Sequence, residues 1–406
     1  MKHIDKIYNY LFVLLCFIIP ISGLAKAVPN ILIIALVVLF PFHSLRNSIK
    51  SIKKELLFLL AFILIIALNT LLFQRFEDMS IISRLVFIPL FIALAIPVKN
   101  FKACLSSFVI GSFFILLMSS IQIGLISLES KVELVNGAKI AEFLMGERPY
   151  LGFIYLISVC FSVYLGVNSN HKYLRTLYIG LAVLFAAFIF IMAARIAALS
   201  VVLGLALSLF YFLRKIKNKA MLLIGISVFG LLMYGLSGNM IKRFYVGNEY
   251  VNVITADPRY YIWGCATQMS VENTSDLLFG KGYYGVEDEL VLCYTTKVDF
   301  LDAEQQQWFI DSRFNTHNQF FDIFLSQGIL ATLLFCFFFL YLAFISRKNF
   351  FMLSLVLFLF LFFMVENVLT RQLGCMLVGF VLCFILRQQA NRKKIESAQK
   401  PVKLML

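Results

Sequence analysis

Long apolar segments, separated by short stretches with charged and polar residues, recur along almost the whole chain. A helix needs roughly 20 mostly apolar residues to cross the hydrocarbon core of a bilayer. Twelve segments are near this length, and we expect transmembrane helices at residues 8–25, 30–44, 56–74, 80–97, 104–127, 150–167, 176–193, 197–213, 221–237, 318–345, 350–366 and 371–387. This succession predicts an all-α polytopic membrane protein.

The composition excludes a soluble fold of this size. Of the 406 residues, 61% are hydrophobic and 14% are charged. Soluble domains have roughly 45–50% apolar and about 25% charged residues. A single core could not bury so much apolar surface, because the outside of a soluble protein must still be covered with polar groups.

Lysine and arginine are concentrated in loops that share one side if twelve helices alternate across the membrane. These loops and the two termini hold 22 of the 36 Lys and Arg residues, and such residues are retained on the cytoplasmic side. The net charge of +14 then divides into about +19 on the cytoplasmic side and about −5 on the outer side. Membrane topology accounts for the basic balance, so no nucleic-acid partner is expected.

The amino terminus has some features of a cleavable signal peptide, namely Lys6, an apolar stretch and Ala25-Lys26-Ala27. The apolar stretch is long for a signal peptide, and a second apolar segment follows directly. We therefore expect an uncleaved first helix with both termini in the cytoplasm.

This topology divides the chain into four parts. Residues 1–236 contain helices one to nine, 237–317 form a large outer loop with short helices, 318–390 contain helices ten to twelve, and 391–406 form a basic cytoplasmic tail. A second outer loop covers residues 129–149. Loops of this length are usually functional or disordered. The large loop is rich in tyrosine and also carries both tryptophans, which indicates that it folds.

Within the large loop, Asp257-Pro258 is typical of a helix start, with an N-cap followed by proline at the first helical position. We expect a helix from Pro258 to about Ser270. Arg259 then lies in the first turn, where its guanidinium and the free helix amides could bind an anion. An ion pair between Arg259 and Asp257 explains the pattern equally well.

Arg195 is the only charged residue between Thr176 and Leu213. It is predicted at the outer turn of a tight hairpin. An arginine at membrane depth is energetically costly, so its presence there indicates a functional role. The alternative is a side chain that reaches the interface without a special role. Arg84, Arg148 and Arg371 also fall at predicted outer helix ends, and together these arginines would surround the outer face with guanidinium groups.

His317 is the only one of four histidines predicted on the outer side, where the large loop meets the tenth helix. Histidine is well suited to accept a proton near neutral pH, although a lone histidine at an interface is often structural.

The eight cysteines show no metal-ligand spacing. Cys265 and Cys293 share the large loop, where a disulfide or two free thiols are possible. The glycine-rich residues 280–285 lack the spacing of a phosphate-binding loop and indicate a tight turn.

Several of these residues form a recognisable set. His317-Asn318, nine further residues and Gly328 form an HN-x9-G pattern that resembles the motif of the O-antigen ligase and O-antigen polymerase superfamily of bacterial envelope glycosyltransferases. Arg259-x3-Trp263, the turn at residues 278–282 and Ala194-Arg195 resemble other parts of the family pattern. Ala331 departs from the ligase form, which has Gly, Thr or Tyr at this place.

The resemblance implies a glycan donor carried on undecaprenyl pyrophosphate at the outer face of the bacterial inner membrane. The acceptor would be the lipid A core for a ligase, or another lipid-linked glycan for a polymerase. His317, Arg195 and Arg259 would be catalytic, the arginines by stabilising the charge that develops on pyrophosphate. We expect metal-independent chemistry without a cofactor. Further substrate-binding residues would be Arg84, Arg148, Asn318, Trp263 and Arg371.

The ligase is favoured over the polymerase, because the R-x10-G pattern of some polymerases is absent. Ser270 and Phe324 stand where that pattern would need glycine after Arg259 and Arg313. A ligase for glycoprotein acceptors is a further form. A transporter or flippase is the alternative of another class, but transporters often show internal repeats and charges at the membrane midplane, and neither is visible here.

Overall fold

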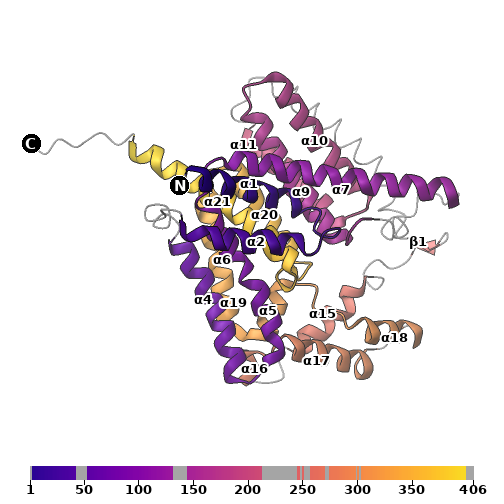
Figure 1. The fold of residues 1–406 in the computed structure, drawn as a ribbon. Coiled ribbons are helices and arrows are strands. Elements are labelled where there is room, and N and C mark those ends of the chain that lie inside the picture. The colour runs from indigo at the N-terminus through magenta and orange to yellow at the C-terminus, as the bar shows by residue number, and fades with distance from the viewer. Residues whose placement is uncertain are drawn as a thin grey trace, which may run out of the picture.

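The computed structural model describes residues 2–42, 53–130, 144–212, 245–246, 249–250, 257–269, 274–298, 300 and 303–398. Over these residues the chain is helical, apart from a short antiparallel pairing of β1 (Tyr245–Val246) with β2 (Glu249–Tyr250). The start of α1 and the end of α21 lie toward the same side of the molecule (Figure 1).

The helices before the large loop are α1 (Lys2–Ile18), α2 (Val28–Leu39), α4 (Lys53–Leu72), α5 (Met79–Leu85), α6 (Phe87–Ala95), α7 (Phe101–Ser130), α9 (Arg148–Val167), α10 (Lys172–Ile191) and α11 (Arg195–Phe212). Those of the large loop are α15 (Pro258–Met269), α16 (Thr274–Phe279), α17 (Tyr283–Thr296) and α18 (Ala303–Ser312). The last are α19 (Gln319–Ser346), α20 (Phe350–Phe363) and α21 (Gln372–Ala398). Short 3-10 turns cover Phe40–Phe42, Phe76–Asp78 and Val368–Thr370.

The structure confirms an all-helical membrane protein. Among the described residues, seven helices are long and apolar enough to cross a membrane, and shorter apolar helices cover Val28–Phe42, Arg195–Ser208 and Phe350–Phe363. The predicted segment 221–237 lies outside the described residues, as do His43, most of the 129–149 loop and the end of the tail. The total of twelve spans and their orientation therefore remain predictions.

Proline accounts for two of the differences between the predicted and the observed helices. α1 ends at Ile18 rather than near residue 25, because Pro20 disfavours a helical conformation at the residue before it. The predicted helix 80–97 is divided at Val86 into α5 and α6. Pro89 has no N–H to donate to the Leu85 carbonyl, so the helical hydrogen-bond pattern is interrupted there.

Aromatic rings pack the main core around α21. The Phe380 ring lies 5.0 Å from Phe108 of α7 and 5.4 Å from Phe161 of α9, measured between ring centroids. It also contacts Phe91 of α6 at 5.9 Å. All four side chains are almost fully buried. The high phenylalanine content therefore serves contacts between helices as well as any contact with lipid.

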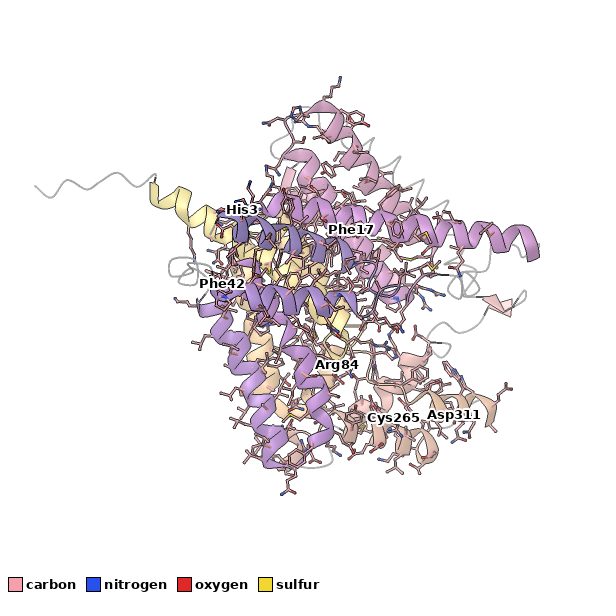
Figure 2. All side chains as sticks on the ribbon, viewed as in Figure 1. His3, Phe17, Phe42, Arg84, Cys265 and Asp311 are labelled. Atoms are coloured by element: carbon pink, nitrogen blue, oxygen red, sulfur yellow. A yellow bond between two sulfur atoms is a disulfide. The ribbon has the colours of Figure 1, made fainter. Side chains whose placement is uncertain are left out.

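The helices of the large loop pack around a second, smaller core. Phe309 of α18 is 1% exposed and lies among Ile262, Leu290 and Tyr294 of α15 and α17. A disulfide joins Cys265 to Cys293 and thereby links α15 to α17. This resolves the choice between a disulfide and free thiols. These helices form a compact group beside the lower end of α5 and α19 (Figures 1 and 2).

The glycine-rich turn docks directly on α19, where that helix is kinked at Gly328. The Lys281 and Gly282 amides donate to the Leu325 and Ser326 carbonyls, both at 2.8 Å. Gly328 and Gly280 have φ values of +76° and +66°, which favour glycine. The turn is therefore a docking element, and it fixes the large loop against the start of α19.

Replacing Gly328 by alanine should undo this docking. A Cβ at Gly328 would lie 2.1 Å from the Leu278 carbonyl oxygen, and the backbone conformation itself would be strained. We expect the Lys281 and Gly282 amides to exchange their hydrogens about tenfold faster or more. Gly180→Ala is the control, because a Cβ there meets nothing within 4 Å. Unchanged protection of the two amides in the Gly328 variant would contradict the docking role.

Candidate active site

His317 lies in the short connection between α18 and α19, and its backbone is held on both sides. Asn318 is the N-cap of α19, and its side-chain oxygen accepts from the Phe320 and Phe321 amides at 2.9 and 3.1 Å. The His317 amide donates to Asn315 Oδ1 at 3.0 Å. The backbone φ of His317 is +44°. The imidazole is thus presented from a tightly constrained turn.

Trp263 of α15 secures the same turn from the loop side. Its indole Nε1 donates to the Thr316 carbonyl at 3.0 Å. The Thr316 hydroxyl is buried and donates to the Asn318 carbonyl at 3.0 Å. The position of α15 and the position of the imidazole are therefore coupled through the residue that precedes His317.

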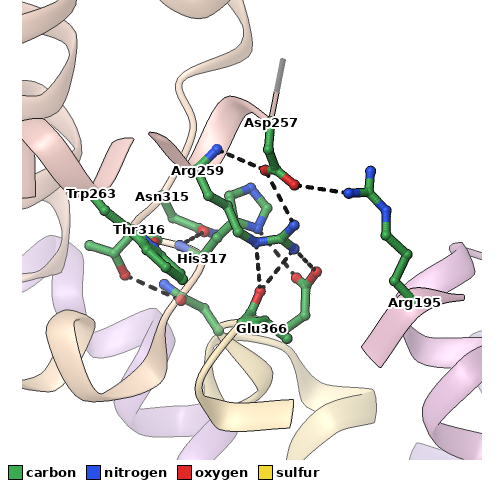
Figure 3. A network of polar contacts seen from close by, with 10 residues as sticks. Arg195, Asp257, Arg259, Trp263, Asn315, Thr316, His317 and Glu366 are labelled. Carbon is green, nitrogen blue, oxygen red and sulfur yellow. Dashed lines mark hydrogen bonds and ion pairs between the residues drawn. The ribbon is translucent and has the colours of Figure 1, made fainter. Parts of the chain in front are cut away.

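Glu366 joins His317 to Arg259 (Figure 3). It lies between α20 and the 3-10 turn Val368–Thr370. One carboxylate oxygen is 3.3 Å from His317 Nδ1, and the other accepts from Arg259 Nη2 at 2.8 Å. The same nitrogen of Arg259 donates to the Val365 carbonyl at 3.0 Å. The carboxylate can orient the imidazole and stabilise its protonated form.

Asp257 extends this network to Arg195. Its Oδ1 accepts from the Arg259 amide at 3.0 Å, which caps α15 as the sequence predicts, and lies 3.6 Å from Arg259 Nη1. Its Oδ2 lies 3.2 Å from Nη1 of Arg195, the first residue of α11. The Arg195 side chain is 47% exposed, so this pair orients more than it stabilises.

Five charged or titratable side chains thus follow one another in the order Arg195, Asp257, Arg259, Glu366 and His317. The ion pair between Arg259 and Asp257, one of the two alternatives from the sequence, is present, and the pair with Glu366 is closer. Binding of an anion at Arg259 remains a prediction. In the network, carboxylates hold both guanidinium groups in defined positions.

The two arginines face a cavity of about 700 Å³. Its lining combines charged side chains with apolar ones. The full lining is Arg148, Pro149, Ala193, Ala194, Arg195, Ile196, Leu199, Asp257, Arg259, Tyr260, Trp263, Phe362, Val365 and Glu366. This combination suits a ligand with an anionic group and an apolar body. We call it the arginine cavity.

His317 lines a different cavity of about 400 Å³, which we call the histidine cavity. Its lining is strongly polar and includes carboxylates, arginines and tyrosines, namely Arg84, Tyr283, Tyr284, Glu287, Arg313, Asp322, Thr370 and Arg371 beside His317. Burial raises the pKa of Glu287, although Arg313 acts in the opposite direction. Hydroxyl-rich ligands such as sugars suit this lining, because carboxylates accept and arginines donate hydrogen bonds.

Each residue singled out from the sequence has a defined place. Arg148, Arg195, Arg259 and Trp263 line the arginine cavity, and Arg84, His317 and Arg371 line the histidine cavity. Asn318 lines neither of the two and caps α19 instead. The contact between His317 and Glu366 connects the cavities, because each of these residues lines one of them.

Glu366, Glu287 and Asp322 were not predicted from the sequence. A signal for Glu366 was present, since it is the only acidic residue between Asp322 and Glu396. A single carboxylate at the end of an apolar helix is expected to pair with a cationic or hydrogen-bonding side chain. The sequence held no comparable signal for Glu287, which lies among other acidic residues. Within the described ranges, no group of three or more His, Cys, Asp or Glu side chains is arranged to hold a metal ion.

Residues 180–336 match the family model described as O-antigen ligase. The match includes Arg195, Arg259, His317 and Gly328. Such a match implies a glycosyltransferase-like enzyme of the O-antigen pathway, and the apolar helices agree with a membrane protein. The match supports the resemblance to the O-antigen ligase and polymerase superfamily that the HN-x9-G pattern indicates. No curated protein matches the sequence.

Proposed function

We propose that the protein transfers a glycan from undecaprenyl pyrophosphate to the lipid A core, at the periplasmic face of the inner membrane. The observation that carries this proposal is the network from Arg195 to His317. It links an amphipathic cavity with fixed guanidinium groups to a polar cavity with an imidazole. A lipid-linked pyrophosphate fits the first cavity, and a sugar acceptor fits the second.

In this proposal the donor pyrophosphate contacts Arg195 and Arg259, whose planar forks match phosphate oxygens. Asp257 and Glu366 keep the two forks oriented when the site is empty and after the product leaves. The prenyl chain lies along the apolar lining, which includes Leu199 and Phe362.

The acceptor hydroxyl attacks the anomeric carbon of the donor sugar, and the bond from this carbon to the pyrophosphate oxygen breaks. The electron pair remains on pyrophosphate, where the arginines stabilise the growing charge. The hydroxyl proton passes to His317, and Glu366 stabilises the resulting imidazolium. The products are the new glycoside and undecaprenyl pyrophosphate.

The choice of ligase over polymerase rests on the HN-x9-G pattern and on the absence of R-x10-G around Arg259 and Arg313. Deleting the gene and separating the surface polysaccharide on a gel tests this choice. We expect all capped core species to disappear and long lipid-linked chains to accumulate. Core that carries a single repeat would instead indicate a polymerase, and an unchanged ladder would contradict both.

A further inference from the structure

A third cavity of about 740 Å³, the lysine cavity, adjoins the histidine cavity and shares Arg84 and Arg371 with it. It lies between the connection from α1 to α2, the start of α9 and the start of α21. Its lining includes Lys26, Glu147, Tyr150, Leu151, Ile154 and Leu373 as well as the two shared arginines. Arg84 lies where the helical bundle approaches the loop helices (Figure 2).

Positive charge predominates in this cavity. Three cationic side chains, Lys26, Arg84 and Arg371, face one carboxylate, Glu147, which pairs with Arg371. Arg84 donates to the Thr370 carbonyl at 2.5 Å. In the part of the chain that the structure describes, neither Lys26 nor Arg84 has a carboxylate within ion-pair distance. Two cationic groups are therefore available to an anion.

Apolar side chains form the rest of the wall, among them Leu24, Leu151, Ile154 and Leu373. A ligand that satisfies both parts of the lining has an anionic head and an apolar body. Several converging cations suit a multiply charged group such as phosphate better than a single carboxylate. The chemistry of this cavity thus resembles that of the arginine cavity.

We infer that the lysine cavity binds a phosphate at the lipid end of the acceptor. The acceptor glycan then extends past Arg84 and Arg371 into the histidine cavity and presents its hydroxyl to His317. This inference rests on the proposed function and adds the site that holds the phosphate of the acceptor glycolipid. Separate cavities keep the phosphates of donor and acceptor apart, which limits their mutual repulsion.

The phosphate can belong to the disaccharide of lipid A or to a lipid-linked pyrophosphate, and binding measurements distinguish the two. Purified protein in nanodiscs is titrated with lipid A, with lipid A from which the phosphates have been removed, and with undecaprenyl pyrophosphate. We expect the Lys26→Gln/Arg84→Gln variant to bind phosphorylated lipid A about tenfold more weakly, because charge-assisted hydrogen bonds are lost. Its binding of dephosphorylated lipid A should be unchanged. Weakening confined to undecaprenyl pyrophosphate would assign the site to a lipid-linked acceptor.

Lys99→Gln is the control variant, because Lys99 is exposed and lies on the predicted cytoplasmic side. If the double variant does not fold, the salt dependence of wild-type binding provides the test, and it should be steep only for phosphorylated lipids. Equal affinity of the wild type for both forms of lipid A and for undecaprenyl pyrophosphate would overturn the inference. Since binding needs no transfer, failure of the proposed reaction would be seen separately, as absence of product with intact lipid binding.

Discussion

Replacing His317 by asparagine should lower the rate of glycan transfer by about two to four orders of magnitude, the usual contribution of a general base. The imidazole lines the polar cavity, and its Nδ1 lies 3.3 Å from Glu366. Without it, the attacking hydroxyl loses the proton acceptor that the proposed reaction places here. The measurement is the initial rate of transfer by purified protein at equal membrane content.

Asparagine is the appropriate replacement, because His317 has a φ of +44°. Asparagine tolerates this region far better than alanine, so loss of activity would not reflect backbone strain. His171→Asn serves as the control, since His171 precedes α10 on the predicted cytoplasmic side. Wild-type activity of the His317 variant would exclude a catalytic role for the imidazole.

Replacing Arg259 by lysine should slow transfer by about a hundredfold, although the charge is kept. The effect follows the loss of one positioned donor to a developing negative charge. The Arg259 guanidinium donates to Glu366 at 2.8 Å and to the Val365 carbonyl at 3.0 Å. A lysine ammonium cannot make both of these hydrogen bonds and also donate two parallel hydrogen bonds to pyrophosphate. Initial rates at saturating donor report this change.

The control for Arg259 is Arg175→Lys, because Arg175 lies at the start of α10 and donates to the Ser169 carbonyl. A double-mutant cycle with Glu366→Gln adds a sharper test. The two residues share one contact, so their effects on the rate should not be additive. A wild-type rate in Arg259→Lys would show that the guanidinium fork plays no part in the reaction, and additive effects would show that its contact with Glu366 plays none.

The sequence predicted the helices well, because the length of an apolar segment and the charged residues at its ends are properties of that segment alone. The Asp257-Pro258 pair predicted the start of α15, which begins at Pro258. Proline also explains the break at Val86, although hydropathy alone indicated one continuous helix. These features depend on residues that are neighbours in the sequence.

The site itself depends on contacts that no local pattern encodes. Glu366 is 49 residues from His317 and 107 residues from Arg259, so only the tertiary fold brings the segment after α20 to these two side chains. In the same way, the HN-x9-G pattern identified Gly328 as part of a motif. Only the structure shows that the missing side chain of Gly328 lets the turn at Gly280 pack against α19. The division of the predicted arginines between two cavities was equally beyond the sequence.

We propose that this chain forms a glycosidic bond at the expense of a lipid pyrophosphate. The most direct test of this proposal is a reconstituted reaction that contains only the purified protein, undecaprenyl-pyrophosphate-linked glycan and lipid A core in liposomes. We predict that glycosylated core and free undecaprenyl pyrophosphate appear in equal amounts with the wild type, and that His317→Asn produces neither above background. Release of undecaprenyl pyrophosphate without glycosylated core, or movement of the intact donor across the membrane without either product, would contradict it.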